Sequence, residues 1–430
     1  MNRPDSTGAP AATPPLWAPE TAAAARAEAD RALRECFPAV VGVPPHRAVL
    51  LIPDGGLYLC FRVLRIFHEA GVKVDLLCPR GHPLKHSRYI RHVCECADWA
   101  DVERKFGRLI GHPARPWRRT LVAHEPSVRR LLDSLDADTL AAWQPGLTAP
   151  GVREFYHGKF GLPAAQARWG LPLPPNRICH NADELHAFAV EIGGPVIVKP
   201  SDKLGGIGIR KFNDAAAVVA ARAELHFPLL AQKFITGQRV VLDLFCSNRR
   251  LLGWLSSRSI AQANGPFTYS TGRHFRPMPQ LRALAELIAA EGRMEGFCGV
   301  DCLEEAGTGR VYMLEFNPRL SSGWRFGRYG GVDFALAAAA WVEGVTLAEP
   351  LTVPADCDLR AHYFPADLFG CIRRRDWRGL KNWLPGANSY HDICWDDPLV
   401  FCAWLGGRLV KRLRKSTAVL AVRAVAPTTA

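Results

Sequence analysis

The stretch GFCGVDCLEEAGTGRVYMLEFNPR, residues 296–319, decides how this sequence is interpreted. The segment Gly307–Gly309 is typical of the centre of a turn, so the stretch predicts a β-hairpin. A three-residue loop there sets a register in which Asp301 lies directly opposite Glu315. Asn317, two residues beyond Glu315, points to the same face. The pattern predicts two neighbouring carboxylates and one amide on one face of a hairpin.

Two carboxylates held side by side repel each other unless a positive charge lies between them. Oxygen ligands of this kind suit Mg²⁺, which takes one or two carboxylates and completes its shell with substrate phosphates. The alternative is a solvated acidic pair on a hairpin. The neutral Asn317 and the following Arg319 add groups suited to a phosphate, and they favour the metal site. We therefore expect Asp301, Glu315 and Asn317 to hold Mg²⁺, or Mn²⁺ in its place.

A second stretch, PVIVKPSDKLGGIGIRKF at 195–212, combines a lysine with closely spaced glycines. Lys199 ends an apolar strand, where its point charge can reach a phosphate. Gly205, Gly206 and Gly208 leave the backbone free to fold over a phosphate and to offer N–H donors. The Walker A pattern GxxxxGK[ST] is missing from this stretch. Its position between a strand and the hairpin indicates a phosphate-binding loop of another kind.

A third stretch, LLAQKFITGQ at 229–238, is an apolar strand that runs into a turn. As a pattern it is an ordinary strand. Its turn can also expose backbone groups to the edge of an adenine, with Phe234 and Ile235 beside it.

The chain ahead of these stretches predicts a small α/β domain over 46–125. The apolar runs 47–53 and 72–78 are typical of buried strands, and 57–70 has helical spacing. Strand, helix and strand within about 30 residues form the βαβ pattern of a parallel, doubly wound sheet.

The middle of the chain predicts an α+β domain, because strands and helices occur in runs. Asn181 and Glu184 form the capping pattern at the start of a helix over 181–193. The segment 256–277 is read as a polar loop. The resulting plan has four parts: a disordered tail with a helix (1–45), the βαβ domain (46–125), the α+β domain (126–350) and a basic extension (351–430).

Composition excludes several classes of protein. The 430 residues are 48% hydrophobic and 22% charged, which is typical of a soluble globular chain. We find neither a secretory signal nor an apolar run of membrane-spanning length. The 13 dispersed cysteines indicate reduced thiols in the cytoplasm rather than disulfides or zinc ligands. The net charge of +13 favours anionic partners.

Taken in order, these segments resemble an ATP-grasp enzyme over about 155–345. VKP at 198–200, LGGIGI at 204–209 and EFNPR at 315–319 carry the resemblance. It implies a two-lobed ATP-grasp fold, preceded by a Rossmann-like pre-ATP-grasp domain that corresponds to the βαβ segment.

The resemblance also implies roles for individual residues. The implied nucleotide-binding residues are Lys159, Lys199, Gly205, Gly206, Gly208, Gln232, Lys233, Phe234, Ile235 and Asp243. The implied metal ligands are Asp301, Glu315 and Asn317, and the implied catalytic residues are Lys199 and Arg319. Arg319 would steady the transferring phosphoryl group or an anionic intermediate.

Two positions depart from the family pattern. Arg239 stands where a glutamate usually binds the ribose hydroxyls, so Asp243 is the candidate to replace that contact. Gln232 stands in the adenine-binding hinge where a glutamate is usual.

The resemblance implies a carboxylate ligase whose substrates are a small-molecule carboxylate and an amine. The carboxylate attacks the γ-phosphate of ATP to give an acylphosphate and ADP, and the amine then displaces phosphate. The sequence does not choose among the arginines that can hold the carboxylate, which are Arg258, Arg273, Arg276, Arg325 and Arg328.

Three alternatives stay open. One is an ATP-grasp carboxylase that uses bicarbonate, and a second is a nucleotide-binding fold without turnover. The third is a scaffold attached to anionic membrane or nucleic acid by the basic helix predicted over 399–415, for which a solvated helix end is the simpler explanation. The RRRDWR segment at 373–378 lacks the interleaved aromatics of a single-strand binder, which argues against nucleic acid.

Overall fold

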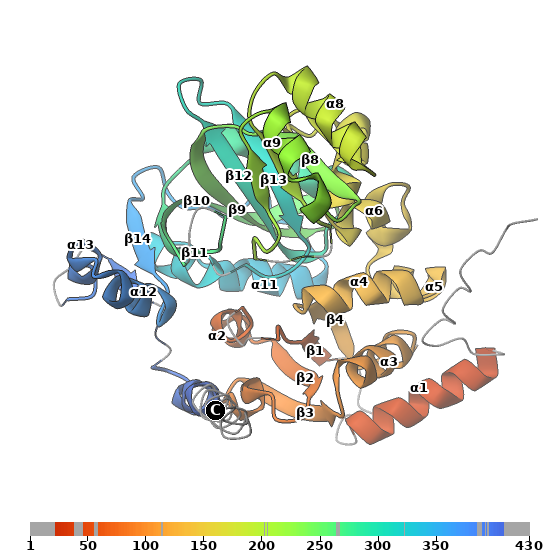
Figure 1. Cartoon of the computed structure of the whole chain (residues 1–430). Coiled ribbons are helices and arrows are strands. Elements are labelled where there is room, and N and C mark those ends of the chain that lie inside the picture. The colour runs from red at the N-terminus through yellow and green to blue at the C-terminus, as the bar shows by residue number, and fades with distance from the viewer. Residues whose placement is uncertain are drawn as a thin grey trace, which may run out of the picture.

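The computed structural model describes residues 22–37, 46–55, 59–112, 115–201, 203, 205–263, 267–321, 323–384, 389–391, 393 and 395–407. Three β-sheets organise this part of the chain (Figure 1). One is a parallel sheet near the N-terminus, one is a small antiparallel sheet, and one is a larger sheet built mainly from antiparallel strands.

The N-terminal sheet confirms the predicted doubly wound domain. Its order is β3-β2-β1-β4, and all neighbours are parallel. The strands are β1 (His46–Ile52), β2 (Lys73–Pro79), β3 (Ile90–Cys96) and β4 (Trp117–Val122). Along β1, Leu50 packs into the core that contains α1 (Ala22–Cys36) and α3 (Trp99–Ile110), while Leu51 faces the core that contains α2 (Phe61–Glu69). Alternate residues are buried on opposite faces, as a sheet covered on both sides requires.

The small sheet forms one lobe of the second domain and has its own core. It has the order β5-β8-β6-β7 and is covered by two helices, α8 (Ala182–Ile192) and α9 (Ala215–Ala220). Its strands are β5 (Asn176–Cys179), β6 (Val196–Lys199), β7 (Arg210–Phe212) and β8 (Leu229–Lys233). The predicted cap of α8 is confirmed, because Asn181 Oδ1 accepts a hydrogen bond from Glu184 N at 2.9 Å.

The large sheet has the order β13-β12-β9-β10-β11-β14-β15. Its strands are β9 (Gly237–Ser247), β10 (Arg250–Gln262), β11 (Ser270–Phe275), β12 (Gly296–Glu305), β13 (Val311–Asn317), β14 (Leu359–His362) and β15 (Tyr390–His391). The predicted polar loop over 256–277 is wrong, since this segment contains the end of β10 and all of β11. Several of its polar side chains are buried in the sheet, and Ser256 Oγ, for example, donates to Arg276 O at 2.7 Å.

The C-terminal segment joins this sheet, because β14 pairs with β11. Two short helices follow, α12 (Ala366–Arg374) and α13 (Trp377–Lys381), at the left edge of Figure 1. Residues 398–407 are helical, and Val400 and Trp404 pack into the core beside α2 and α11 (Phe334–Glu343). The first part of the predicted basic helix therefore packs on the protein, and its residues 408–415 lie outside the described residues.

The remaining elements connect and cover these sheets. They are η2 (Pro83–His86), α4 (Glu125–Ser134), α5 (Ala137–Trp143), η3 (Pro145–Thr148), α6 (Val152–His157), η4 (Lys159–Gly161), α7 (Leu162–Trp169), η5 (Arg222–Glu224), η6 (Pro279–Leu281), α10 (Arg282–Glu291), η7 (Trp324–Gly330) and α11 (Phe334–Glu343). Within the described residues, no helix combines the length and the apolar character needed to cross a membrane. The cysteines of the same residues are all free thiols.

Candidate active site

Asp301 and Glu315 lie opposite each other across β12 and β13, as the sequence predicts. Asn317 pairs with Gly299, two residues along, so its side chain shares their face. The amide and one carboxylate are in contact, because Asn317 Nδ2 donates to Asp301 Oδ2 at 3.3 Å. The hairpin thus brings two carboxylates and an amide together.

The turn that closes the hairpin differs from the predicted three-residue loop. Glu305 N donates to Arg310 O at 2.8 Å, so the loop between them has four residues. The pairs near the turn are therefore one residue out of step with the Asp301–Glu315 pair, and Leu314 is the extra residue of a β-bulge between them. The bulge thus places Asp301 opposite Glu315, a pairing that the sequence predicted from a three-residue turn.

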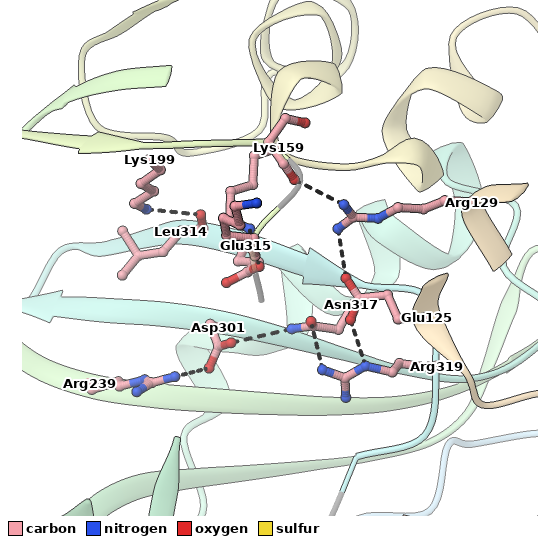
Figure 2. A network of polar contacts seen from close by, with 12 residues as sticks. Glu125, Arg129, Lys159, Lys199, Arg239, Asp301, Leu314, Glu315, Asn317 and Arg319 are labelled. Atoms are coloured by element: carbon pink, nitrogen blue, oxygen red, sulfur yellow. Dashed lines mark hydrogen bonds and ion pairs between the residues drawn. The ribbon is translucent and has the colours of Figure 1, made fainter. Parts of the chain in front are cut away.

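Two cations hold the β13 side chains of the cluster (Figure 2). Lys159, in η4, is buried, and its Nζ lies 2.9 Å from Glu315 Oε1. Arg319 Nη2 donates to Asn317 Oδ1 at 3.2 Å. Lys159 thus supplies a counter-charge to Glu315, and Arg319 holds the amide of Asn317.

Arg239, the departure from the family pattern, contacts Asp301. Its Nη2 lies 3.0 Å from Asp301 Oδ1, and its Nη1 donates to Thr268 O. Burial acts to raise the pKa of Asp301, but the Arg239 guanidinium holds that pKa below its ordinary value. Arg239 thus serves as a counter-charge to a predicted metal ligand.

Lys199 ends β6 and points toward the bulge. Its side chain is buried, and its Nζ donates to Leu314 O at 3.3 Å. Burial lowers the pKa of Lys199 to about 8, and the neighbouring carboxylate of Glu315 partly offsets that effect. This lysine loses its proton near neutral pH far more readily than an exposed lysine does.

We expect nucleotide affinity to fall as the pH rises through about 8, the pKa of Lys199. A phosphate attracts the charged ammonium, which is present below that pH and is lost above it. Calorimetry with Mg·ADP at pH 7 and pH 9 should show a loss of about tenfold. Lys199→Arg should remove this dependence, since a guanidinium stays protonated over the whole range. An equal loss in that variant would contradict the assignment.

The helix α4, which follows β4, also reaches the hairpin. Arg319 Nε lies 2.8 Å from Glu125 Oε2, and the other oxygen of Glu125 lies 2.8 Å from Arg129 Nη2. Arg129 Nη1 donates to Ser201 O at 2.9 Å, just ahead of the glycine loop. Figure 2 shows this chain of contacts from Arg239 through the hairpin to Arg129. The sequence shows only a Glu–Arg pair at i, i+4 on α4, which is common on any helix surface.

A cavity of about 410 Å³ lies between the small sheet and the hairpin. Five of the predicted nucleotide-binding residues line it, namely Lys199, Gln232, Lys233, Phe234 and Ile235, and Asp301 and Glu315 line it as well. Gln232 is 1% exposed, and neither polar atom of its side chain has a hydrogen-bond partner. Buried polar atoms are normally paired, and Gln232 stands in the wall of this cavity with both of its side-chain polar atoms unpaired.

The glycine loop lies beside this cavity, although its glycines are not among the described residues that line it. A Cβ added at Gly206 would lie 2.1 Å from Phe267 O, and φ at Gly206 is +84°. Phe267 itself lines the cavity. The loop therefore needs glycine in order to pack against the segment that forms one wall.

Asp243, the predicted ribose contact, forms an ion pair inside the protein. Its side chain is fully buried, and its Oδ2 lies 2.8 Å from Arg273 Nη1. Asp243 is not among the described residues that line the 410 Å³ cavity. A Cβ at Gly323 would lie 2.0 Å from Asp243 Oδ2, which shows how closely the chain covers it. The structure assigns Asp243 to an internal ion pair.

A second cavity, of about 400 Å³, lies on the other side of Asp301. Arg239, Arg273 and Arg319 line it, together with Tyr363 and Ala366 from the C-terminal segment. Of the five arginines predicted for a substrate carboxylate, Arg273 is in this wall, whereas Arg325 and Arg328 line a separate groove of about 660 Å³. Neither Arg258, which pairs with Glu304, nor Arg276 is among the described lining residues of these cavities.

The donor set of the hairpin fits a hard divalent cation. Asp301, Glu315 and Asn317 offer oxygen atoms only, and two carboxylates are the number that Mg²⁺ uses when phosphates and water supply the rest. The described residues contain no cluster of three or more histidine, cysteine, aspartate or glutamate side chains that could hold a metal by themselves. The site suits a cation that arrives with its phosphates.

Comparisons with known proteins agree with this geometry. A family profile described as an ATP-grasp domain matches residues 166–323. The carbamoyl phosphate synthase large chain of Xanthomonas campestris is 32% identical in an alignment of 199 residues, which covers 42% of this chain and 18% of that protein. The chain thus spans less than a fifth of that curated relative.

Solved structures share the fold. An ADP complex of N5-carboxyaminoimidazole ribonucleotide synthetase matches with a TM-score of 0.58 and 16% identity, over 78% of this chain and 86% of that one. An L-amino acid ligase from Bacillus licheniformis matches with a TM-score of 0.50 and 16% identity, over 71% of this chain and 76% of that one. Together with the family profile, these likenesses show that residues 166–323 match an ATP-grasp domain and that the chain shares the fold of these ATP-grasp proteins.

Proposed function

We propose that this protein is an ATP-dependent ligase that activates a small-molecule carboxylate as an acylphosphate, releases ADP and joins the acyl group to an amine. One observation carries the proposal: a cavity lined by the predicted nucleotide-binding residues adjoins an arginine-lined cavity at Asp301. Phosphoryl transfer between two substrates needs this kind of junction, with positive charge beside it.

The position of each residue in the site indicates its role in the proposed reaction. Asp301, Glu315 and Asn317 would hold Mg²⁺, which neutralises charge on the transferring phosphates when it is bound. Lys199 and Lys159 lie on either side of Glu315 and attract the phosphate chain. Arg319, held by Glu125, offers a rigid positive charge at the hairpin end, where a phosphoryl group develops negative charge. No side chain needs to act as a nucleophile in this reaction.

Different residues would bind the adenine of the nucleotide and the carboxylate of the second substrate. The unpaired amide of Gln232 can accept from and donate to the edge of an adenine. Arg273, whose Nε is buried without a hydrogen-bond partner, is our candidate for the substrate carboxylate. The loop at 205–208, packed on Phe267, would exclude water and so protect an acylphosphate from hydrolysis.

Calorimetry of ATP binding in the presence and absence of Mg²⁺ tests the nucleotide site. The wild-type protein should bind Mg·ATP, and Lys199→Ala should bind it about 100-fold more weakly, since a buried charge-assisted contact is lost. Lys85→Ala is the matched control, because Lys85 forms an ion pair with Glu95 in the first domain. A folded wild-type protein that does not bind Mg·ATP would refute the proposal.

Screening for ADP release then tests the reaction. Release that requires an organic carboxylate together with an amine would support the ligase. Release that requires bicarbonate would select the carboxylase instead, and binding without any ADP release would leave a nucleotide-binding protein.

A further inference from the structure

The two cavities of the candidate active site share a pair of side chains. Among the described residues that line them, Arg239 and Asp301 belong to both walls. Arg239 Nη2 lies 3.0 Å from Asp301 Oδ1, so the ion pair itself stands between the cavities. A phosphoryl group that moves from the nucleotide to the second substrate must pass beside this pair.

The ion pair conflicts with the binding of a divalent cation. Asp301 Oδ1 is engaged by Arg239 and Oδ2 by Asn317, so a cation that takes Asp301 as a ligand competes with the guanidinium. Two positive charges close to one carboxylate also repel each other. Arg239 keeps a second anchor, since its Nη1 donates to Thr268 O, and it can leave Asp301 without losing its place in the wall.

We propose that Arg239 is a latch on Asp301. In the metal-free protein the guanidinium neutralises the carboxylate. When a divalent cation takes Asp301, Arg239 is released and binds a phosphate-type oxyanion at the junction of the two cavities. This inference rests on the proposed function for the identity of that oxyanion, which is the phosphoryl group in transfer. Its consequence is an order of events, with the cation and the nucleotide binding before the oxyanion site forms.

Titration with Mn²⁺ alone, followed by electron paramagnetic resonance, tests the competition without nucleotide or turnover. Arg239→Gln removes the competing charge and should raise Mn²⁺ affinity about tenfold, the scale on which a neighbouring cation shifts the proton affinity of a carboxylate. Arg239→Lys keeps the charge and should restore affinity close to that of the wild type. Arg258→Gln is the matched control, because Arg258 forms an ion pair with Glu304 of the same sheet and lies outside both cavity walls described here.

Calorimetry with inorganic phosphate tests the released state. Phosphate should bind the Mg·ADP complex of the wild type and of Arg258→Gln, and it should bind the complex of Arg239→Gln about tenfold more weakly. Thermal unfolding of each variant checks that the fold is intact.

The outcomes separate the latch from the proposed function. Equal Mn²⁺ affinity in the wild type and Arg239→Gln would overturn the latch, whether or not the protein binds ATP. An equal rise in Arg258→Gln would also overturn it, because a general change in net charge would then explain the effect. Failure of the wild type to bind Mg·ADP would instead refute the proposed function, and the Mn²⁺ titration would still decide the competition.

Discussion

Glu315→Ala is expected to abolish the Mg²⁺ dependence of ATP binding and to weaken binding about 100-fold. The substitution removes a predicted metal ligand from β13. It also removes the counter-charge of Lys159, whose Nζ lies 2.9 Å away and whose side chain is 5% exposed. With Lys159 unpaired and Lys199 buried nearby, the positive charges are no longer balanced. We expect the free energy of unfolding to fall by about 2 kcal/mol, less than for a fully buried pair because the Glu315 side chain is 27% exposed.

Calorimetry with and without Mg²⁺ measures the first effect, and urea unfolding measures the second. Glu304→Ala is the control, because Glu304 forms an ion pair with Arg258 on the same sheet and is not among the described residues that line the nucleotide cavity. If Glu315→Ala binds ATP with an unchanged response to Mg²⁺, the hairpin is not the metal site and the pair with Lys159 is only structural.

Asp243→Ala is expected to cost about 3–5 kcal/mol of stability, which for many domains is enough to prevent folding. Asp243 is fully buried, and its partner Arg273 is 7% exposed. Removing the carboxylate leaves a buried guanidinium without its counter-charge. Burial and the attraction of Arg273 act on Asp243 in opposite directions, and burial prevails, since the pKa of this carboxyl is raised above its ordinary value.

Asp243→Asn keeps the shape and tests whether this residue contacts the ribose. Chemical denaturation gives the loss of stability, and the affinity ratio of ATP to 2′-deoxy-ATP gives the contribution of the sugar hydroxyl. We expect a lower unfolding free energy and an unchanged ratio. A ratio that falls toward one in Asp243→Asn would return Asp243 to the nucleotide site.

Local sequence patterns predicted much of the fold. Two strands of the N-terminal sheet, β1 and β2, follow from apolar runs, and the capped helix α8 follows from Asn181, because these features depend on neighbours within a few residues. The prediction of a polar loop over 256–277 was wrong for the opposite reason, because this segment depends on distant parts of the chain. Its serines and arginines read as solvent-exposed, but the sheet buries three of the serines and Arg273, and Asp243 supplies a partner for Arg273.

In the candidate site, too, short segments of sequence predicted some features, and distant residues determine the others. Spacing along one hairpin was enough to place Asp301 opposite Glu315, although the bulge at Leu314 achieves it rather than the predicted turn. A bulge is set by the strands on either side, and here Met313 N leaves the ladder to donate to Pro172 O at 2.7 Å. The residues of the hairpin alone do not identify Pro172 as the partner of Met313.

The sequence by itself determined the ATP-grasp fold, the hairpin with its carboxylates, and the lysine and hinge segment that line the 410 Å³ cavity, because each motif lies within one short segment. Only the tertiary structure decided which charges meet. Three ion pairs join residues that are 62 to 194 positions apart in the sequence: Arg239 with Asp301, Lys159 with Glu315, and Glu125 with Arg319. The strength of an ion pair depends on distance in space and on burial, and neither is written in the spacing of residues along the chain.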